Sequence, residues 1–352
     1  MATSFKTLTQ NNKVTSKTLL HENIPITGTL VSGTYAVASS GREENLKTFS
    51  HGMFQSVYDY PYVSSSANHI FDITNGFSTT GSSVSASAAT NIVSQVSKKV
   101  NIYNQMAQVL AGYTTSSTVR RFDEDGQLDG ESGNKIDNAI FINFSRLLVK
   151  DEIKKGSFSM KLGTHAAYAT PFNTITTITD SDSTSSFKIN SPAGEYGILY
   201  NGASKVGLLY YQAGVAVLTS SVFGGSVILE GGTNTSESLF TGSTIDTYAD
   251  AFRHRVQNIS FNNTTELNST IYFCKANNTE FNYSSNPTYL SGSKIRVKTN
   301  PGTYEVGNHP RAYVTTVGLY SHDNELLAVA KLSEPLRKDP TNELTLRVRL
   351  DY

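Results

Sequence analysis

The clearest pattern along the chain is a set of apolar residues recurring at three- and four-residue steps. Its members are Ile92, Val96, Val100, Tyr103, Met106 and Leu110. This spacing places their side chains on one face of a helix. Gly112 follows, where a left-handed C-terminal cap is common. The pattern predicts one amphipathic helix over about 90–111, with this face against the core or another subunit.

Most other apolar segments are short and are interrupted by polar residues or glycines, which is typical of β-strands. Residues 139–144 predict a buried strand, and residues 158–162 alternate as in a half-buried strand. Repeated Val, Leu and Tyr runs separated by glycines predict a β-meander over 196–229, and residues 24–37 predict a further β segment. We therefore expect a mainly β, multi-domain β-sandwich or β-meander architecture. Besides the long helix it would hold one or two short ones, at 147–155 and 244–256.

The last forty residues carry two strand signals. Apolar runs at 313–320 and 326–332 flank a polar segment, which predicts a β-hairpin. In 344–352 every second residue is apolar, so five side chains fall on one face of a sheet. We expect the burial of that face to dock this strand.

Composition suggests where the chain divides. Segments 79–90 and 231–242 are rich in Ser, Thr and Gly, as in flexible connectors. The aromatic block 51–62 contains Pro61, which favours an ordered loop or a sheet edge. We expect four parts: an N-terminal β segment with this aromatic loop (1–78), a flexible stretch with the amphipathic helix (79–118), a central β domain (119–230) and a C-terminal β domain with the docked strand (231–352).

Charge and aromatic content favour a protein that binds other proteins. The 352 residues include 29 Lys and Arg and 29 Asp and Glu, and only 16% of residues are charged. The formal net charge is therefore zero, whereas nucleic-acid-binding proteins usually carry an excess of basic residues. There are 19 Tyr and 17 Phe, and interface cores are depleted in charge and enriched in aromatic residues. Our interface candidates are Tyr58, Tyr60, Tyr62, Tyr313, Leu319 and Tyr320. For the first three tyrosines, packing on the protein's own sheet and stacking on a sugar remain alternatives.

Export and membrane signals are absent from the sequence. No stretch reaches 18 apolar residues, and the first thirty residues hold no apolar signal core. We expect synthesis in a cytoplasm and no membrane partner. The single cysteine, Cys274, excludes an internal disulfide framework and a Cys-based zinc site.

No catalytic or cofactor motif is recognisable, so we expect neither an enzyme nor a bound cofactor. Ser321, His322 and Asp323 carry the letters of a hydrolytic triad, but adjacent residues alternate in direction, which favours a turn. Asp180 and Asp182 could be a glycosidase pair, but tryptophan is absent and a solvated loop is favoured.

The acidic cluster around Gly126 partly matches a calcium loop. Asp123, Asp125 and Asp129 would take the third, fifth and ninth positions. Arg121 and Ser132 would then occupy the first and twelfth, where carboxylates are needed. These aspartates are weak candidates, so we favour an acidic turn and expect no metal.

Four segments together resemble a virion structural protein of contractile-tailed phages, in particular the large marine cyanophages. They are 51–62, 142–152, 191–197 and the hairpin residues 317–320 with 325–330. The hairpin is also similar to attachment modules that dock tail fibres. Here another strand follows it and no fibre shaft is present, which favours an adaptor, baseplate or neck component.

The resemblance implies a structural subunit of the virion, with other virion proteins and copies of itself as partners. It would belong to the tail, neck, baseplate or fibre attachment. Two alternatives remain open within a phage particle: a receptor- or glycan-binding appendage module, and a capsid decoration protein. A depolymerase using Asp180 and Asp182 is the enzymatic alternative.

Overall fold

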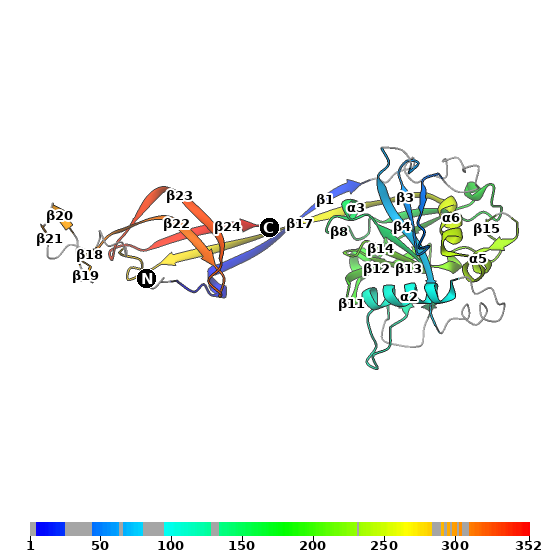
Figure 1. Ribbon diagram of the computed structural model, residues 1–352, viewed down its shortest axis with the longest axis horizontal. Helices are drawn as coiled ribbons and strands as arrows, with labels where there is room; N and C mark the ends of the chain where they lie inside the picture. The colour runs from blue at the N-terminus through cyan, green and yellow to red at the C-terminus, as the bar shows by residue number, and fades with distance from the viewer. Residues whose placement is uncertain are drawn as a thin grey trace. The chain divides into compact units, whose positions relative to one another are not determined.

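A computed structural model of the chain describes residues 5–24, 44–62, 66–79, 95–127, 134–230, 232–283 and 310–352, with the short pieces 290–291, 294–295, 298–300 and 303–304. The chain divides into two units (Figure 1). We call residues 20–265 the central unit, and residues 1–19 together with 266–352 the terminal unit. Two strands, β1 (Lys13–Ile24) and β17 (Val256–Ala276), contribute residues to both units.

The central unit is built on one antiparallel sheet. Its strand order is β17-β9-β10-β12-β13-β14-β7-β4-β3-β2, with β11 beside β12 and β8 beside β17. The bounds of these strands are β2 (Leu46–Thr48), β3 (Gln55–Tyr58), β4 (His69–Phe77), β7 (Asn138–Phe144), β8 (Glu152–Ile153), β9 (Ser159–Gly163), β10 (Ile175–Thr179), β11 (Lys188–Ser191), β12 (Gly194–Asn201), β13 (Ser204–Tyr210) and β14 (Val215–Thr219).

Two short strand pairs accompany this sheet, β5 (Phe122–Asp123) with β6 (Lys135–Ile136) and β15 (Ile228–Glu230) with β16 (Asn234–Thr235). The mainly β prediction is confirmed. The predicted strands appear as β7 and β9, and β12, β13 and β14 form the predicted meander.

The middle of the sheet is buried on both faces. On β7, Ile140, Ile142 and Phe144 belong to one apolar cluster, while Ala139 and Phe141 belong to a second cluster on the opposite face. Neighbouring β14 shows the same alternation. A strand covered on both sides has no polar face, which explains the uninterrupted apolar run at 139–144.

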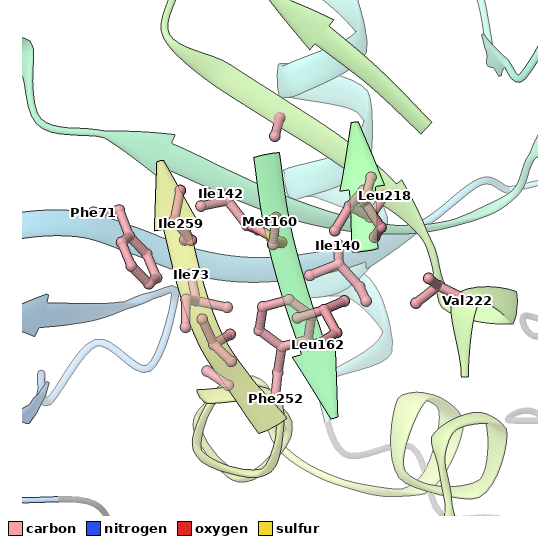
Figure 2. Packing of buried hydrophobic residues seen from close by; sticks show 14 of the residues in the cluster. Phe71, Ile73, Ile140, Ile142, Met160, Leu162, Leu218, Val222, Phe252 and Ile259 are labelled. Atoms are coloured by element: carbon pink, nitrogen blue, oxygen red, sulfur yellow. The ribbon is translucent and has the colours of Figure 1, made fainter. Parts of the chain in front are cut away.

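The first cluster also draws in strands far from β7 in the sheet order. Met160 and Leu162 of β9 and Ile259 of β17 pack with Ile140 and Ile142 (Figure 2). Four strands separate β9 from β7 in the sheet, so shared packing requires the sheet to curl back on itself. One continuous sheet thus supplies two packed layers, as in a sandwich.

Helices contribute buried residues to both apolar clusters. On one side lie α5 (Ser236–Gly242) and α6 (Ile245–Arg255), which add Phe240, Tyr248 and Phe252 to the first cluster. On the other side lies α2 (Val96–Leu110), which adds Tyr103 and Leu110 to the second (Figure 1). Shorter elements are α3 (Arg146–Val149), α4 (Ser183–Ser186) and the 3₁₀ turns η1 (Gln10–Asn12), η2 (Pro171–Asn173) and η3 (Ser220–Val222).

The predicted amphipathic helix is confirmed from Val96 onward, and Ile92 lies outside the described residues. Gly112 has φ +82°, as the predicted cap requires. α2 packs tightly on β4 because Gly76 has no side chain: a Cβ there would lie 2.5 Å from the carbonyl oxygen of Lys99.

One helix prediction and one connector prediction need correction. The helix expected at 147–155 is a single turn, α3, after which the chain enters β8. The connector expected at 231–242 contains α5, whose N-terminus is capped by the Thr235 hydroxyl accepting the N–H of Ser238. Its Leu239 and Phe240 are buried in the core, so two apolar residues outweigh the Ser/Thr-rich composition. The predicted helix at 244–256 is confirmed as α6.

The terminal unit contains the hairpin β22 (Ala312–Tyr320) and β23 (Leu326–Lys338), which confirms the predicted hairpin. Its β24 (Leu344–Asp351) pairs with β17, which also pairs with β1. Two small pairs complete it, β18 (Leu290–Ser291) with β19 (Lys294–Ile295) and β20 (Lys298–Asn300) with β21 (Thr303–Tyr304).

The terminal unit buries very little apolar surface. Of the 51 buried apolar residues in the described parts of the chain, 50 belong to the central unit and only Val348 belongs to the terminal unit. The prediction that five apolar side chains of the last strand are buried is therefore wrong, although the strand does pair: Tyr352 is 71% exposed. Val348 is buried and Leu344, Leu346 and Leu350 are half-buried, so the apolar face of β24 is only partly covered.

The four predicted parts do not coincide with the two units. Strand β4, from the first predicted part, pairs along its length with β7 from the third. The first 19 residues belong with 266–352. Pairing between strands distant in sequence leaves no trace in local composition. The predicted β segment over 24–37 and the connector over 79–90 lie outside the described residues, apart from Ile24 and Thr79.

A buried lysine links α2 to α5. The side chain of Lys99 is fully buried, and its Nζ donates hydrogen bonds to the carbonyls of Phe240 (2.6 Å) and Ser243 (2.7 Å). These carbonyls are at the C-terminal end of α5, where a cation is favourable. Burial nevertheless lowers the pKa of Lys99 to about 8, because the charged form loses its hydration.

This pKa gives a prediction about stability and pH. Above pH 8 the folded protein releases the Lys99 proton, whereas the unfolded chain keeps it to about pH 10.4, so the free energy of unfolding should rise with pH. Between pH 7.5 and 9.5 we expect wild type to gain about 1–2 kcal/mol relative to Lys99→Met in urea unfolding. Lys98→Met keeps Lys99 and should show the wild-type rise. Equal pH dependence in wild type and Lys99→Met would contradict the assignment.

Candidate interaction surface

Exposed apolar side chains gather on the hairpin of the terminal unit. We call Phe5, Tyr320, Leu326, Leu327 and Val329 the hairpin patch; their side chains are 46–67% exposed. Tyr320 is paired with Leu326 across the hairpin, and its ring lies 4.9 Å from that of Phe5, centroid to centroid. Contiguous apolar patches on a protein surface usually mark contacts with other molecules.

Backbone geometry concentrates these side chains. Val329 is opposite Gly318, where an added Cβ would lie 2.9 Å from the ring of Tyr320. The absent side chain at Gly318 leaves room for the tyrosine to lie across the strand. The register shifts between Leu319 and Tyr320, which is a β-bulge. Along β23, exposed Leu327 and Val329 alternate with half-buried Ala328 and Ala330, so one face of the strand stays open to solvent.

The predicted interface candidates lie in two different units and differ in exposure. Tyr313 and Tyr320 are exposed on β22, and Leu319 between them is half-buried. In the central unit, Tyr60 and Tyr62 are exposed after the end of β3. Tyr58 is half-buried on β3, with its ring 5.8 Å from that of His69, so its packing is partly on the protein's own sheet.

Four members of the hairpin patch were not among the predicted interface residues, namely Phe5, Leu326, Leu327 and Val329. A signal for them does exist in the sequence. Residues 326–330 are all apolar, which a strand needs only when both of its faces are covered. The chain supplies no such cover among the described residues.

The hairpin loop brings Ser321, His322 and Asp323 closer than expected. The Ser321 Oγ lies 3.3 Å from His322 Nδ1, and His322 Nε2 lies 3.2 Å from Asp323 Oδ1. Our expectation that these neighbours cannot meet was wrong, because a turn does not alternate as a strand does. All lie on the open loop, where the side chains of His322 and Asp323 are 89% and 66% exposed. A hydrolytic triad needs a substrate cleft with oxyanion donors, which this loop does not provide.

The acidic turn around Gly126 is tied to cationic side chains. Asp123 is fully buried and forms an ion pair with Lys135, while its Oδ1 accepts the N–H of Asp125. Burial is the main influence raising the pKa of Asp123, and Lys135 opposes it. Asp129 lies outside the described residues. In the part of the chain that the structure describes, no group of three His, Cys, Asp or Glu side chains could hold a metal ion.

A polar cavity of about 500 Å³ opens beside this turn, lined by Arg121, Glu124, Asn134, Lys135, Asp137, Thr219 and Ser221. Its charges are matched, because Arg121 pairs with Asp137 at 3.2 Å and Lys135 pairs with Asp123. No aromatic side chain lines it. The cavity therefore lacks the stacking surface that a sugar site would need.

The two aspartates of the glycosidase alternative have different surroundings. Asp180 is fully buried: its Oδ2 accepts the N–H of Gly156 (2.8 Å) and the hydroxyl of Tyr211 (3.0 Å), and its Oδ1 accepts the N–H of Phe158 (2.9 Å). Burial raises its pKa, although these donors favour the charged form. Asp182 is exposed. The solvated loop predicted for both is wrong for Asp180, which holds the loop before β9 in place.

This arrangement predicts an effect on stability. Asp180→Ala leaves three donors without an acceptor, of which the N–H of Phe158 and the hydroxyl of Tyr211 are buried, so we expect the free energy of unfolding to fall by about 2–4 kcal/mol. Asp182→Ala is the matched control, with an expected change within about 0.5 kcal/mol. Equal losses in the two variants, measured by urea unfolding, would contradict the structural role of Asp180.

Comparison with protein-family models, with curated proteins and with solved structures finds no match to this chain. None of the helices in the described ranges is long and apolar enough to cross a membrane.

Proposed function

We propose that this chain is a structural subunit of a tailed-phage virion, in the tail, neck, baseplate or fibre attachment, which acts by binding other virion proteins through its terminal unit. The observation that carries this proposal is the hairpin patch. Among the described residues of its unit, one apolar residue is buried and thirteen large ones are exposed. Such a surface gains free energy when another protein covers it.

Composition and resemblance support the same function. Only 16% of residues are charged, and 36 are Tyr or Phe, as is typical of a protein with extensive subunit contacts. The hairpin that carries the patch is the segment that resembles tail-fibre attachment modules. These modules dock one virion component onto another through protein contacts.

The alternatives receive less support. A glycan-binding module would use Tyr60 and Tyr62, but sugar recognition also needs polar groups that converge beside an aromatic surface. The cavity beside the acidic turn offers polar groups without an aromatic surface. The depolymerase alternative needs two carboxylates in one cleft, and Asp180 is committed to backbone and tyrosine donors.

The test is whether the chain is part of the particle. Particles of the phage that encodes it would be banded on a density gradient, washed in 1 M NaCl and quantified by mass spectrometry. An abundant host protein would report carry-over. We expect a fixed ratio to the major capsid protein before and after the wash, because apolar contacts are not screened by salt. Recovery only in the soluble fraction of infected cells would contradict the proposal.

A further inference from the structure

Strand β22 of the hairpin has one edge that pairs with β23 and one edge that no other described strand pairs with. The strand, Ala312–Tyr320, is 9 residues long and contains neither a charged residue nor a proline. No hydrogen bond from another described segment reaches its backbone groups. A long, uncharged free edge is a template for pairing with a strand of another chain.

The other described strands of four or more residues that have a free edge carry charged residues, and one of them also carries a proline. Such residues prevent pairing between the edges of different chains. They are Lys13 and Lys17 in β1, Lys188 in β11, Lys331 and Pro335 in β23, and Arg347 and Arg349 in β24. Strand β22 is the exception among them, so its edge is the one open to pairing.

The hairpin turn shows which backbone groups of β22 point to the free edge. The N–H of Ser321 donates to the carbonyl of Glu325 (2.8 Å), so it points toward β23. Backbone groups along an antiparallel strand point alternately toward one neighbouring strand and the other. The groups that point away from β23 are therefore those of Ala312, Val314, Thr316, Gly318 and Tyr320.

Two copies of this edge fit each other in antiparallel directions about Thr316. Each outward-pointing residue of one copy then faces an outward-pointing residue of the other, so the N–H and C=O groups of both edges find partners. The side chains on this face match in size. Tyr320 is opposite Ala312 of the second copy, and Val314 is opposite Gly318.

The opposite face matches as well. Here Tyr313 is opposite Leu319 of the second copy, and Thr315 is opposite Val317. These are non-hydrogen-bonded pairs, whose side chains lie closest across an antiparallel ladder. Tyr313 is 64% exposed in one chain, and this pairing would cover part of its ring. Because β22 has no charged residue, no like charges meet across the two strands.

We propose that β22 pairs with β22 of a second copy of this chain, in antiparallel directions about Thr316, and so joins two hairpins into one continuous sheet. A two-fold contact must be complementary to itself, and this edge meets that condition in backbone direction and in side-chain size. Addition of a strand to an exposed edge is an established mode of recognition. The inference rests on the proposed function, since it names a second copy as one partner of the terminal unit.

Sedimentation equilibrium of the full chain tests the pairing. We expect wild type to have twice the 38.3 kDa mass of one chain. Thr316→Pro removes an outward N–H and no bond to β23, so it should weaken association about tenfold or more. Thr345→Pro is the matched control in β24. The N–H of Tyr352 donates to the carbonyl of Asn268 (2.8 Å), so by the same alternation the N–H of Thr345 points away from β17. This variant should leave the dimer intact.

Disulfide formation tests the register without relying on a destabilising change. In a Cys274→Ser background, chains carrying Thr315→Cys would be mixed with chains carrying Val317→Cys and oxidised mildly. The two positions are opposite each other in the proposed pairing, with Cα atoms about 4.5 Å apart, which a disulfide can span. We expect about tenfold more covalent dimer in the mixture than in either variant alone, because like positions are diagonal and about 7–8 Å apart.

Four results would overturn the inference: a monomer at all concentrations, a mass of three chains, a dimer that Thr316→Pro leaves unchanged, or equal cross-linking in the mixture and in the single variants. If wild type is a monomer but is recovered in washed particles, the inference fails and the proposed function stands. If the mixed disulfide forms but the chain is absent from particles, the pairing stands and the proposed function fails.

Discussion

Apolar burial is distributed very unequally between the two units, and most properties of the chain depend on that contrast. In the central unit the sheet is covered on both faces and curls so that β9 and β17 pack against β7. Each large side chain buried there contributes about 1.5–3 kcal/mol. In the terminal unit the strands pair, but their apolar residues remain in contact with water. Hydrogen bonding alone contributes modestly to net stability, so pairing is a weak substitute for a core.

Buried cationic side chains in the central unit donate hydrogen bonds to backbone carbonyls and so hold neighbouring segments together. Arg255 donates hydrogen bonds to the carbonyls of Gly163 (2.8 Å) and His165 (2.9 Å), and also to Ile228. Lys99 does the same at the end of α5. In the terminal unit, Lys338 donates to Asn282 Oδ1 (2.5 Å) and to the carbonyl of Asp339 (3.0 Å), which fixes the chain before β24. Polar contacts therefore position elements in both units, but only the central unit adds an extensive apolar core.

Sequence patterns predicted the elements whose signals are local. The spacing of Val96, Val100, Tyr103 and Leu110 is enough to place α2, and the run at 139–144 is enough to place β7. The signals of α5 were too short to outweigh a Ser/Thr-rich composition. The pairing of β4 with β7 and the joining of both chain ends in one unit depend on contacts between distant segments, which no local pattern encodes.

The candidate surface was only partly predictable for the same reason. Tyr313 and Tyr320 stood out as aromatic residues in a hairpin, and both are exposed. Leu327 and Val329 were not among the interface candidates, because the sequence of an apolar strand does not show which of its side chains remain uncovered in the fold. Asp180 shows the converse: it looked like a loop carboxylate and is a buried acceptor for three donors. Burial is a property of the assembled fold.

Hydrogen exchange at several chain concentrations tests most directly whether the terminal unit depends on another chain for its core. The amides of β7 provide the internal reference, because that strand is buried within one chain. The account predicts weak protection of the β22 and β23 amides at the lowest concentration and a rise in their protection as the concentration increases, with no change in β7. Hairpin amides as well protected as those of β7 in the most dilute sample would contradict it.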